Sequence, residues 1–98
     1  MAMYTNYLVC YDIEDNKVRK KFYEKLKDLG LVPIQKSVFM GYLKPPEFVA
    51  VQDIAKNLLN EGTDSCLWFA CSLSEDQVRS CLGLKNFTLE DPDGAVTL

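Results

Sequence analysis

The sequence predicts an α+β fold with elements in the order β-α-β-β-α-β, followed by a short helix and a tail. Two segments, residues 6–13 and 64–72, are rich in β-branched and aromatic residues over the length of a strand. Between them, two stretches with apolar residues at helical spacing flank a long β-prone stretch. The 98 residues correspond to one domain. We therefore treat residues 1–98 as a single domain, with a core over about 4–72 and a short helix and tail over about 74–98.

The first strand, predicted over residues 6–13, is apolar at both alternating sets of positions until its end. A strand of this kind is covered on both of its faces. The helix that follows is capped by Asp15 or Asn16. Its buried stripe consists of Val18, Phe22, Leu26 and Leu29. Gly30 stands where a helix commonly ends in the left-handed conformation.

Residues 31–43 are β-prone but too long for one ordinary strand. We predict two short strands that meet near Lys36–Ser37, with Gly41 permitting a bulge. A second helix opens with proline at its first position, at Pro45, and ends at Gly62. Its buried face consists of Phe48, Val51, Ile54, Ala55, Leu58 and Leu59.

The last core strand, over residues 64–72, is again apolar on both sides. Ser74 and Gln77 form a capping-box pattern that predicts a short helix through about Leu82. The tail has a turn signal at residues 91–94 between two short β-prone runs. The whole order matches a ferredoxin-like sandwich, in which both helices cover one face of the sheet. Because two strands are apolar on both sides, we expect a second copy of the chain to cover the open face, giving a homodimer.

The composition excludes several kinds of chemistry. The chain has no histidine, which excludes Ser-His-Asp and Cys-His catalysis and histidine metal sites. The formal net charge is −3, but residues 1–44 hold eight Lys/Arg against five Asp/Glu, and residues 45–98 hold three against nine. This asymmetry hints at a surface that faces a polyanion. No apolar run reaches the length of a membrane span, so we expect a cytoplasmic protein without a membrane partner.

Four cysteines lie in apolar surroundings without the short paired spacing of a zinc hairpin. Cys66 and Cys71 are five positions apart, so along one strand they point to opposite faces. We interpret all four as buried reduced thiols, with a four-cysteine zinc site as the alternative.

Asp12 is the first candidate for chemistry, because it lies at the end of the first strand on the same side as Leu8 and Cys10. A carboxylate on an apolar face needs a cation, a hydrogen-bond donor or water. A two-fold axis through that face would bring two copies of Asp12 together, and two carboxylates either share a proton or bind a cation such as Mg²⁺. In the alternative interpretation, Asp12 accepts hydrogen bonds from backbone amides in the turn before the helix.

The basic side of the first helix is the second candidate. It carries Lys17, Lys20, Lys21 and Lys27, with Arg19 beside the apolar stripe. A row of cations is suited to contact with the phosphate backbone of a nucleic acid, and Lys36 and Lys44 would extend it. In the alternative interpretation, this is a solvated helix surface with pairs such as Lys20–Glu24.

Three blocks occur in order along the chain: Tyr-Leu-Val-Cys-Tyr-Asp-Ile at 7–13, Asn-Lys-Val-Arg-Lys-Lys at 16–21, and Gln-Lys-Ser-Val-Phe-Met-Gly at 35–41. Together with Gly30, this pattern resembles the CRISPR-associated Cas-two (Cas2) family. Members of that family are small ferredoxin-like homodimers that partner the Cas-one (Cas1) integrase during spacer acquisition. The resemblance covers residues 4–72 and is strongest from 7 to 43.

The resemblance implies roles for particular residues. Asp12 would be the catalytic residue and metal ligand of a Mg²⁺- or Mn²⁺-dependent nuclease active on RNA or duplex DNA, with one ion shared between the two Asp12 side chains of a dimer. Arg19 and the neighbouring lysines would face nucleic acid. Ser37 and Phe39 would lie near the paired aspartates. The segment 95–98 would cross to the partner's sheet.

Three hypotheses of function follow. The chain is a Mg²⁺-dependent endonuclease, in which Glu14 or metal-bound hydroxide serves as base because histidine is absent. Alternatively, it is a dimeric adaptor that joins integrase units and binds the backbone of duplex DNA, the spacer precursor, or of single-stranded RNA. The third is an unrelated ferredoxin-like toxin ribonuclease or ligand-binding module. We favour the adaptor, with weak, conditional or absent nuclease activity.

Overall fold

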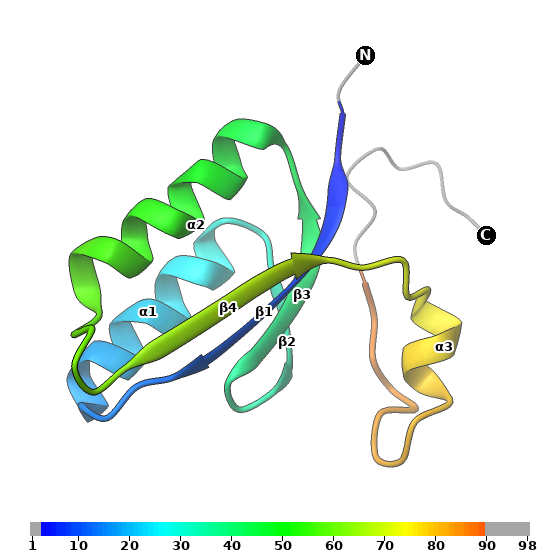
Figure 1. Ribbon diagram of the computed structural model, residues 1–98. Helices are drawn as coiled ribbons and strands as arrows, with labels where there is room; N and C mark the ends of the chain where they lie inside the picture. The colour runs from blue at the N-terminus through cyan, green and yellow to red at the C-terminus, as the bar shows by residue number, and fades with distance from the viewer. Residues whose placement is uncertain (1–2, 90–98) are drawn as a thin grey trace.

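Four antiparallel strands form one sheet, and two long helices pack on one of its faces (Figure 1). This arrangement comes from a computed structural model that describes residues 3–89. The elements are β1 (Thr5–Asp12), α1 (Asn16–Asp28), β2 (Val32–Gln35), β3 (Val38–Leu43), α2 (Pro45–Leu58), β4 (Ser65–Ala70) and α3 (Glu75–Arg79). The strand order is β2-β3-β1-β4, and all neighbours are antiparallel. This is the split β-α-β arrangement of a ferredoxin-like fold, as predicted.

The central strand β1 places alternate side chains on the two faces of the sheet. Val9 and Tyr11 face the helices and belong to the main core, where Val9, Phe22 and Phe39 are completely buried. The Tyr11 ring meets Phe22 edge to face, with ring centroids 5.0 Å apart. Leu8 lies on the other face, opposite Met40 of β3. The predicted apolar stripe of α1 is therefore confirmed, since it packs on the face of the sheet that holds Val9 and Tyr11.

The ends of α1 follow the predicted signals. Asp15 is the N-cap, because its carboxylate accepts hydrogen bonds from the amides of Lys17 at 2.8 Å and Val18 at 3.0 Å. Gly30 adopts a φ of 94°, which suits glycine because it has no Cβ to clash. Asn16, the other candidate cap, is the first residue of the helix instead.

The predicted pair of strands in residues 31–43 is confirmed, with the turn at Lys36–Ser37. The predicted bulge at Gly41 is wrong, since the register irregularity lies between Pro33 and Gln35 of β2. Gly41 serves close packing instead. A Cβ at that position would come within 2.9 Å of the Leu31 side chain and 3.2 Å of the Leu31 Cα.

The second helix ends earlier than predicted, at Leu58 rather than at Gly62. The reason is a turn that competes with the helix. The Asn60 amide donates to the Asp64 carboxylate at 2.9 Å, and Asn60 in turn accepts from the Gly62 amide at 2.8 Å. The predicted opening at Pro45 is confirmed, and the Lys44 amide donates to the Glu47 carboxylate at 2.7 Å.

The capping box of α3 is confirmed, with hydrogen bonds of 2.7 and 3.1 Å between Ser74 and Gln77. The helix ends at Arg79 and does not continue to Leu82 as predicted. The Leu82 side chain is fully exposed, so no burial of apolar surface at this residue favours a longer helix. The predicted turn at 91–94 and the strand at 95–98 lie outside the described residues.

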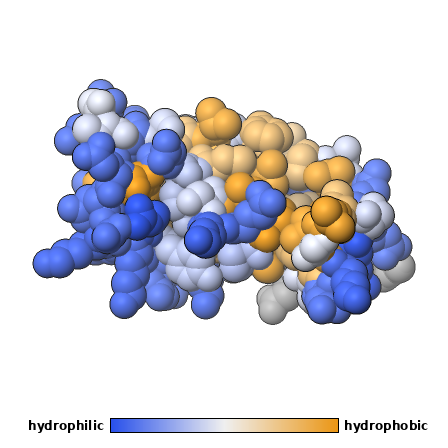
Figure 2. Space-filling view, turned by 90° about the horizontal axis from the view of Figure 1, so that it is seen from below, coloured by the Kyte–Doolittle hydropathy of each residue, from blue (hydrophilic) through white to orange (hydrophobic). Residues whose placement is uncertain are grey.

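The second face of the sheet is covered only in part. Val78 of α3 and Phe87 pack on Met40, which is completely buried. Leu67 and Phe69 of β4 remain 60% and 47% exposed. Figure 2, which views the molecule from below, shows a continuous apolar area. The chain itself thus covers part of the face that we expected a second copy to cover, while the predicted homodimer stays a prediction.

No helix within residues 3–89 combines the length and the apolar character needed to cross a membrane.

Candidate functional site

Asp12 ends β1 on the open face of the sheet, as the alternation of side chains predicts. It pairs with Ser65 of β4, and its side chain is exposed. The alternative role, bonding the amides before the helix, belongs to other carboxylates: the Glu14 amide donates to Asp64 at 2.9 Å, and Asp15 caps α1. No hydrogen bond or ion pair to Asp12 is found among residues 3–89. The Asp12 carboxylate is therefore available to an external partner.

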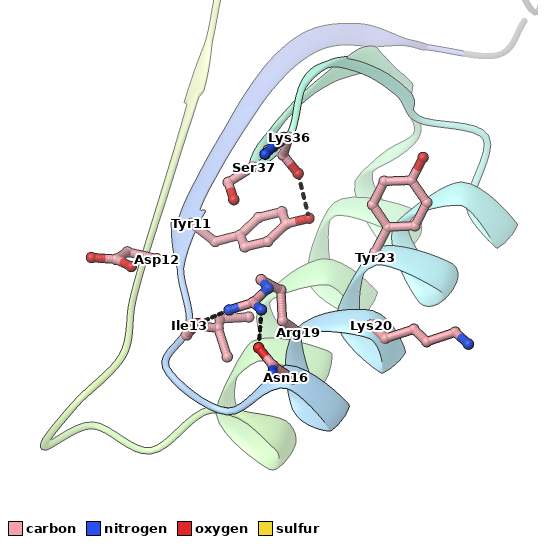
Figure 3. Close-up of a pocket in the computed structure, with 9 residues that line it drawn as sticks. All are labelled: Tyr11, Asp12, Ile13, Asn16, Arg19, Lys20, Tyr23, Lys36 and Ser37. Atoms are coloured by element: carbon pink, nitrogen blue, oxygen red, sulfur yellow. Dashed lines mark hydrogen bonds between the residues drawn. The ribbon is translucent and has the colours of Figure 1, made fainter.

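A cavity of about 590 Å³ lies beside this strand end, between α1 and the turn that joins β2 to β3. Its lining consists of Tyr11, Asp12, Ile13, Asn16, Arg19, Lys20, Tyr23, Lys36 and Ser37. Figure 3 shows Tyr11 and Arg19 on one side of β1 and Asp12 pointing away on the other. The end of β1 thus separates a carboxylate on the sheet side from a basic cavity on the helix side.

Arg19 is held in place at the start of α1. Its guanidinium donates to the Ile13 carbonyl at 2.8 Å and also to the side-chain oxygen of Asn16 (Figure 3). This explains why its side chain is only half-exposed. Predicted as a nucleic-acid contact, it has further N–H groups beyond these two bonds to offer to a ligand.

Tyr11 connects β1 to the turn between β2 and β3. Its hydroxyl donates to the Lys36 carbonyl at 3.3 Å, and its amide donates to the Ser37 carbonyl at 3.0 Å. Burial raises the pKa of the Tyr11 hydroxyl, Tyr23 raises it further, and Arg19 partly offsets the rise. The hydroxyl therefore stays protonated at neutral pH and remains a donor that fixes Lys36.

Four of the five lysines of α1 are exposed, namely Lys17, Lys20, Lys21 and Lys27, and their spacing divides them between two sides of the helix. Lys20 and Lys27 lie three and four residues from Tyr23, and the Lys27 ammonium sits 5.6 Å from the centre of the Tyr23 ring. Lys17 and Lys21 share another side, four residues apart. The alternative pairing Lys20–Glu24 is not formed: among the described residues, the ion pair present is Arg79–Glu75 at 2.9 Å.

Ser37 and Phe39, expected near Asp12, occupy different environments. Ser37 lines the cavity together with Asp12. Phe39 is completely buried and meets the Tyr23 ring at 5.0 Å and the Tyr11 ring at 6.2 Å. It supports the cavity wall from within the core and does not line the cavity.

Sequence reasoning did not include Asn16 and Tyr23 among the site residues. Both line the cavity together with Lys20, because Asn16 and Lys20 are four residues apart, Lys20 and Tyr23 are three apart, and this spacing places all three on one side of α1. The spacing shows that these residues share one side of the helix. It does not show that this side forms a site, because that depends on the turn at Lys36–Ser37, which lies against it in the folded chain.

The cysteines take part in no metal-binding cluster within the described residues. All four are free, and Cys81 is exposed, contrary to the prediction that all are buried. Cys66 and Cys71 pack against opposite faces of the sheet, as predicted. Burial raises the pKa of Cys10 and, together with the nearby Cys10, raises that of Cys66 to about 12. Both thiols are therefore protonated at neutral pH.

The described part of one chain does not gather a cluster of ligands around Asp12. No group of three or more His, Cys, Asp or Glu side chains suited to a metal occurs within residues 3–89. Mg²⁺ is usually bound by one or two carboxylates and otherwise by waters and phosphate oxygens. The Asp12 carboxylate is exposed and has no hydrogen-bond or ion-pair partner within residues 3–89, so it fits one such ligand.

Comparisons with known proteins agree with this geometry. The family model described as CRISPR associated protein Cas2 matches residues 3–81. The CRISPR-associated endoribonuclease Cas2 1 of Francisella tularensis subsp. novicida (strain U112) is 33% identical over 93 residues, which are 95% of each chain. The CRISPR-associated endoribonuclease Cas2 of Korarchaeum cryptofilum (strain OPF8) is 47% identical over 49 residues, 50% of this chain and 53% of the relative.

Solved structures show the same fold. A hypothetical protein from Thermus thermophilus has a TM-score of 0.67 at 31% identity, covering 71% of this chain and 84% of that one. The crystal structure of Streptococcus pyogenes Cas2 at pH 6.5 has a TM-score of 0.63 at 26% identity, covering 78% of this chain and 94% of that one. Sequence and fold therefore point to the same group of proteins.

Proposed function

Because this chain belongs to the CRISPR-associated Cas2 family, we propose that it is a homodimeric CRISPR adaptation protein with a divalent-cation site at Asp12. In this proposal it partners the Cas1 integrase and binds the backbone of duplex DNA. Its nuclease activity toward RNA or duplex DNA is weak or conditional. It acts in the cytoplasm and has no membrane partner. The family membership argues against an unrelated ferredoxin-like toxin or ligand-binding module.

The observation that supports the proposal most strongly is the exposed Asp12 carboxylate at the end of an apolar face, which has no hydrogen-bond or ion-pair partner in the described part of the chain. Leu67 and Phe69 on the same face are 60% and 47% exposed, which a second copy would relieve. A two-fold contact through this face is self-complementary, so each chain contributes the same residues. Two Asp12 carboxylates brought together would repel each other unless a proton or a cation lies between them.

A Mg²⁺ or Mn²⁺ ion at this position would supply charge stabilisation and an acidified water for hydrolysis of a phosphodiester. The role of Asp12 is to hold that ion. Glu14 is the nearest exposed carboxylate along the chain, and it is the candidate proton acceptor in a protein without histidine. The bond from the Glu14 amide to Asp64 fixes the backbone of this residue beside the site.

Contact with the nucleic-acid backbone is proposed for Arg19 and the four exposed lysines of α1. This set consists of Lys17, Arg19, Lys20, Lys21 and Lys27. Contact with phosphates is independent of sequence and falls with salt concentration. The acidic side chains between residues 45 and 89 are left for contact with a basic protein partner, as an adaptor would need.

The test compares Asp12→Ala with Asp53→Ala, which removes an exposed carboxylate from α2 as the matched control. Two activities are measured: Mg²⁺-dependent cleavage of labelled RNA and duplex DNA, and spacer acquisition together with Cas1. We expect Asp12→Ala to lose cleavage and to retain acquisition, while the control keeps both. Unchanged cleavage in Asp12→Ala would rule out the metal site. Loss of acquisition with normal dimerisation would show that the two roles are not separable.

A further inference from the structure

The peptide group that joins Ile13 to Glu14 is held on both sides by charged side chains. The Ile13 carbonyl accepts a hydrogen bond of 2.8 Å from the Arg19 guanidinium of α1 (Figure 3). The Glu14 amide donates a hydrogen bond of 2.9 Å to the Asp64 carboxylate, which lies 50 residues further along the chain, between α2 and β4. Two separate elements therefore fix the orientation of one peptide group just beyond Asp12.

The Asp64 carboxylate is itself anchored on its own side of this contact. Its Oδ2 atom accepts a hydrogen bond of 2.9 Å from the Asn60 amide, and its Oδ1 atom accepts one of 3.2 Å from the Thr63 hydroxyl. The Asn60 side chain closes the same turn by accepting from the Gly62 amide at 2.8 Å. Hydrogen bonds to an ionised carboxylate are stronger than those between neutral groups. The turn therefore presents a carboxylate of fixed position to the end of β1.

The clamped peptide group lies between the two carboxylates of the proposed site. Asp12 is the last residue of β1 and pairs with Ser65, the residue after Asp64. Glu14 follows the end of the strand, where the pairing with β4 has stopped, and its side chain is exposed. The bond from the Glu14 amide to Asp64 continues the link between the two segments beyond the sheet. The direction in which the Glu14 side chain leaves the backbone thus depends on Asp64.

We propose that Asp64 is a positioning residue, which acts through the Glu14 amide to set the Glu14 carboxylate relative to Asp12. The inference rests on the proposed function and makes it more specific, because it names the residue that places the proton acceptor. A misplacement of about 1 Å can lower a rate about 100-fold, so the orientation of one peptide group matters for the reaction.

The turn that holds Asp64 offers a matched control. Asp64→Ala removes the acceptor of the Glu14 amide together with bonds inside the turn. Asn60→Ala removes another bond inside the same turn, the one from the Gly62 amide, and leaves Glu14 bonded to Asp64. Neither side chain belongs to the core, so we expect both variants to fold. Asp64→Asn is a second variant, because its side-chain oxygen can still accept from the Glu14 amide.

The first measurement is hydrogen exchange at the Glu14 amide, followed by NMR in EDTA and without nucleic acid. We expect exchange at this amide to be about tenfold faster in Asp64→Ala than in wild type, because the acceptor is lost. Asn60→Ala should exchange at nearly the wild-type rate. Equal exchange rates in Asp64→Ala and wild type would overturn the proposal, since Asp64 would then not hold Glu14.

The second measurement is Mg²⁺-dependent cleavage of labelled RNA and duplex DNA over a range of substrate concentrations. We expect Asp64→Ala to lower kcat about tenfold and to change KM less than about twofold, because the proton acceptor is displaced while substrate binding is kept. Asn60→Ala should leave both values unchanged, and Asp64→Asn should lose less than Asp64→Ala. In a Glu14→Gln background, Asp64→Ala should cause no further loss, since the carboxylate that Asp64 positions is already gone. A further loss of about tenfold in that background would indicate a general structural role and overturn the proposal.

Failure of the proposed function gives different results. If Asp12→Ala cleaves as well as wild type, the site at Asp12 is wrong, whatever Asp64→Ala does. If Asp12→Ala loses cleavage while Asp64→Ala and Asn60→Ala cleave equally well, only the role of Asp64 is wrong. A wild-type protein without any cleavage contradicts both the nuclease activity and the role of Asp64.

Discussion

The hydroxyl of Tyr11 offers a sharp test of how the cavity is built, through the substitution Tyr11→Phe. Within residues 3–89 the hydroxyl makes one hydrogen bond, to the Lys36 carbonyl at 3.3 Å, which is longer than an ordinary hydroxyl bond. The ring keeps its contact with Phe22, and the amide keeps its bond to the Ser37 carbonyl. Lys36 is exposed, so water can replace the lost donor. The loss of stability should therefore be about 0.5–1 kcal/mol.

The assay is urea unfolding at pH 7, with Tyr23→Phe as the control, since no hydrogen bond of the Tyr23 hydroxyl is found within residues 3–89. A loss of about 1 kcal/mol corresponds to about 4–8 °C in Tm for a domain of this size. We expect a decrease in Tm of that size or smaller for Tyr11→Phe and almost none for Tyr23→Phe. Equal stability of the two variants, or a loss above about 3 kcal/mol, would refute the assignment of one weak bond.

Three further predictions concern the rest of the chain. Gly41→Ala should destabilise the protein by about 1–3 kcal/mol in urea unfolding, because the new Cβ comes within 2.9 Å of the Leu31 side chain; wild-type stability would contradict this packing. Hydrogen bonds from the backbone amides of Glu14 and Asn60 hold the pKa of the Asp64 carboxyl below 3.8. The contribution of Asp64 to stability is therefore present above that pH and is lost as the pH falls through the lowered pKa. Asp64→Asn should make the free energy of unfolding less dependent on pH in the acid range. Burial raises the pKa of Cys66 to about 12, so mass spectrometry after thiol labelling at pH 8 should show exposed Cys81 modified first and Cys66 last. The contribution of the protonated Cys66 thiol to stability is present below pH 9 and should be lost as the pH rises toward 12.

The order of the strands and helices could be predicted because the local capping and turn residues and the spacing of apolar residues indicated the same elements. The apolar stripe of α1, its Asp15 cap and Gly30 are all local features, and the structure confirms each of them. The position of the bulge and the C-terminal ends of α2 and α3 were predicted wrongly, since they depend on contacts that form only in the folded chain. Gly41 was expected at a bulge. Its lack of a side chain is explained instead by Leu31, which precedes β2 and packs closely against the Gly41 backbone.

The site was predicted in part. The position of Asp12 on the open face follows from the alternation of a strand, and the structure places it there. The cavity could not be predicted, because it exists only where α1 meets the turn at Lys36–Ser37. The burial of Met40 by Phe87 was also missed, since nothing local connects residue 87 to β3. Part of the apolar face that suggested a dimer is therefore covered by the chain itself.

The central claim is that two Asp12 carboxylates together hold one divalent cation. It is tested most directly by titrating the protein with Mn²⁺ and measuring free Mn²⁺ by electron paramagnetic resonance, with the oligomeric state determined in the same buffer. Our account predicts one ion for every two chains of a dimer, lost in Asp12→Asn and kept in Asp53→Asn. Binding of the ion by a monomer, or binding that Asp12→Asn leaves intact, would contradict it.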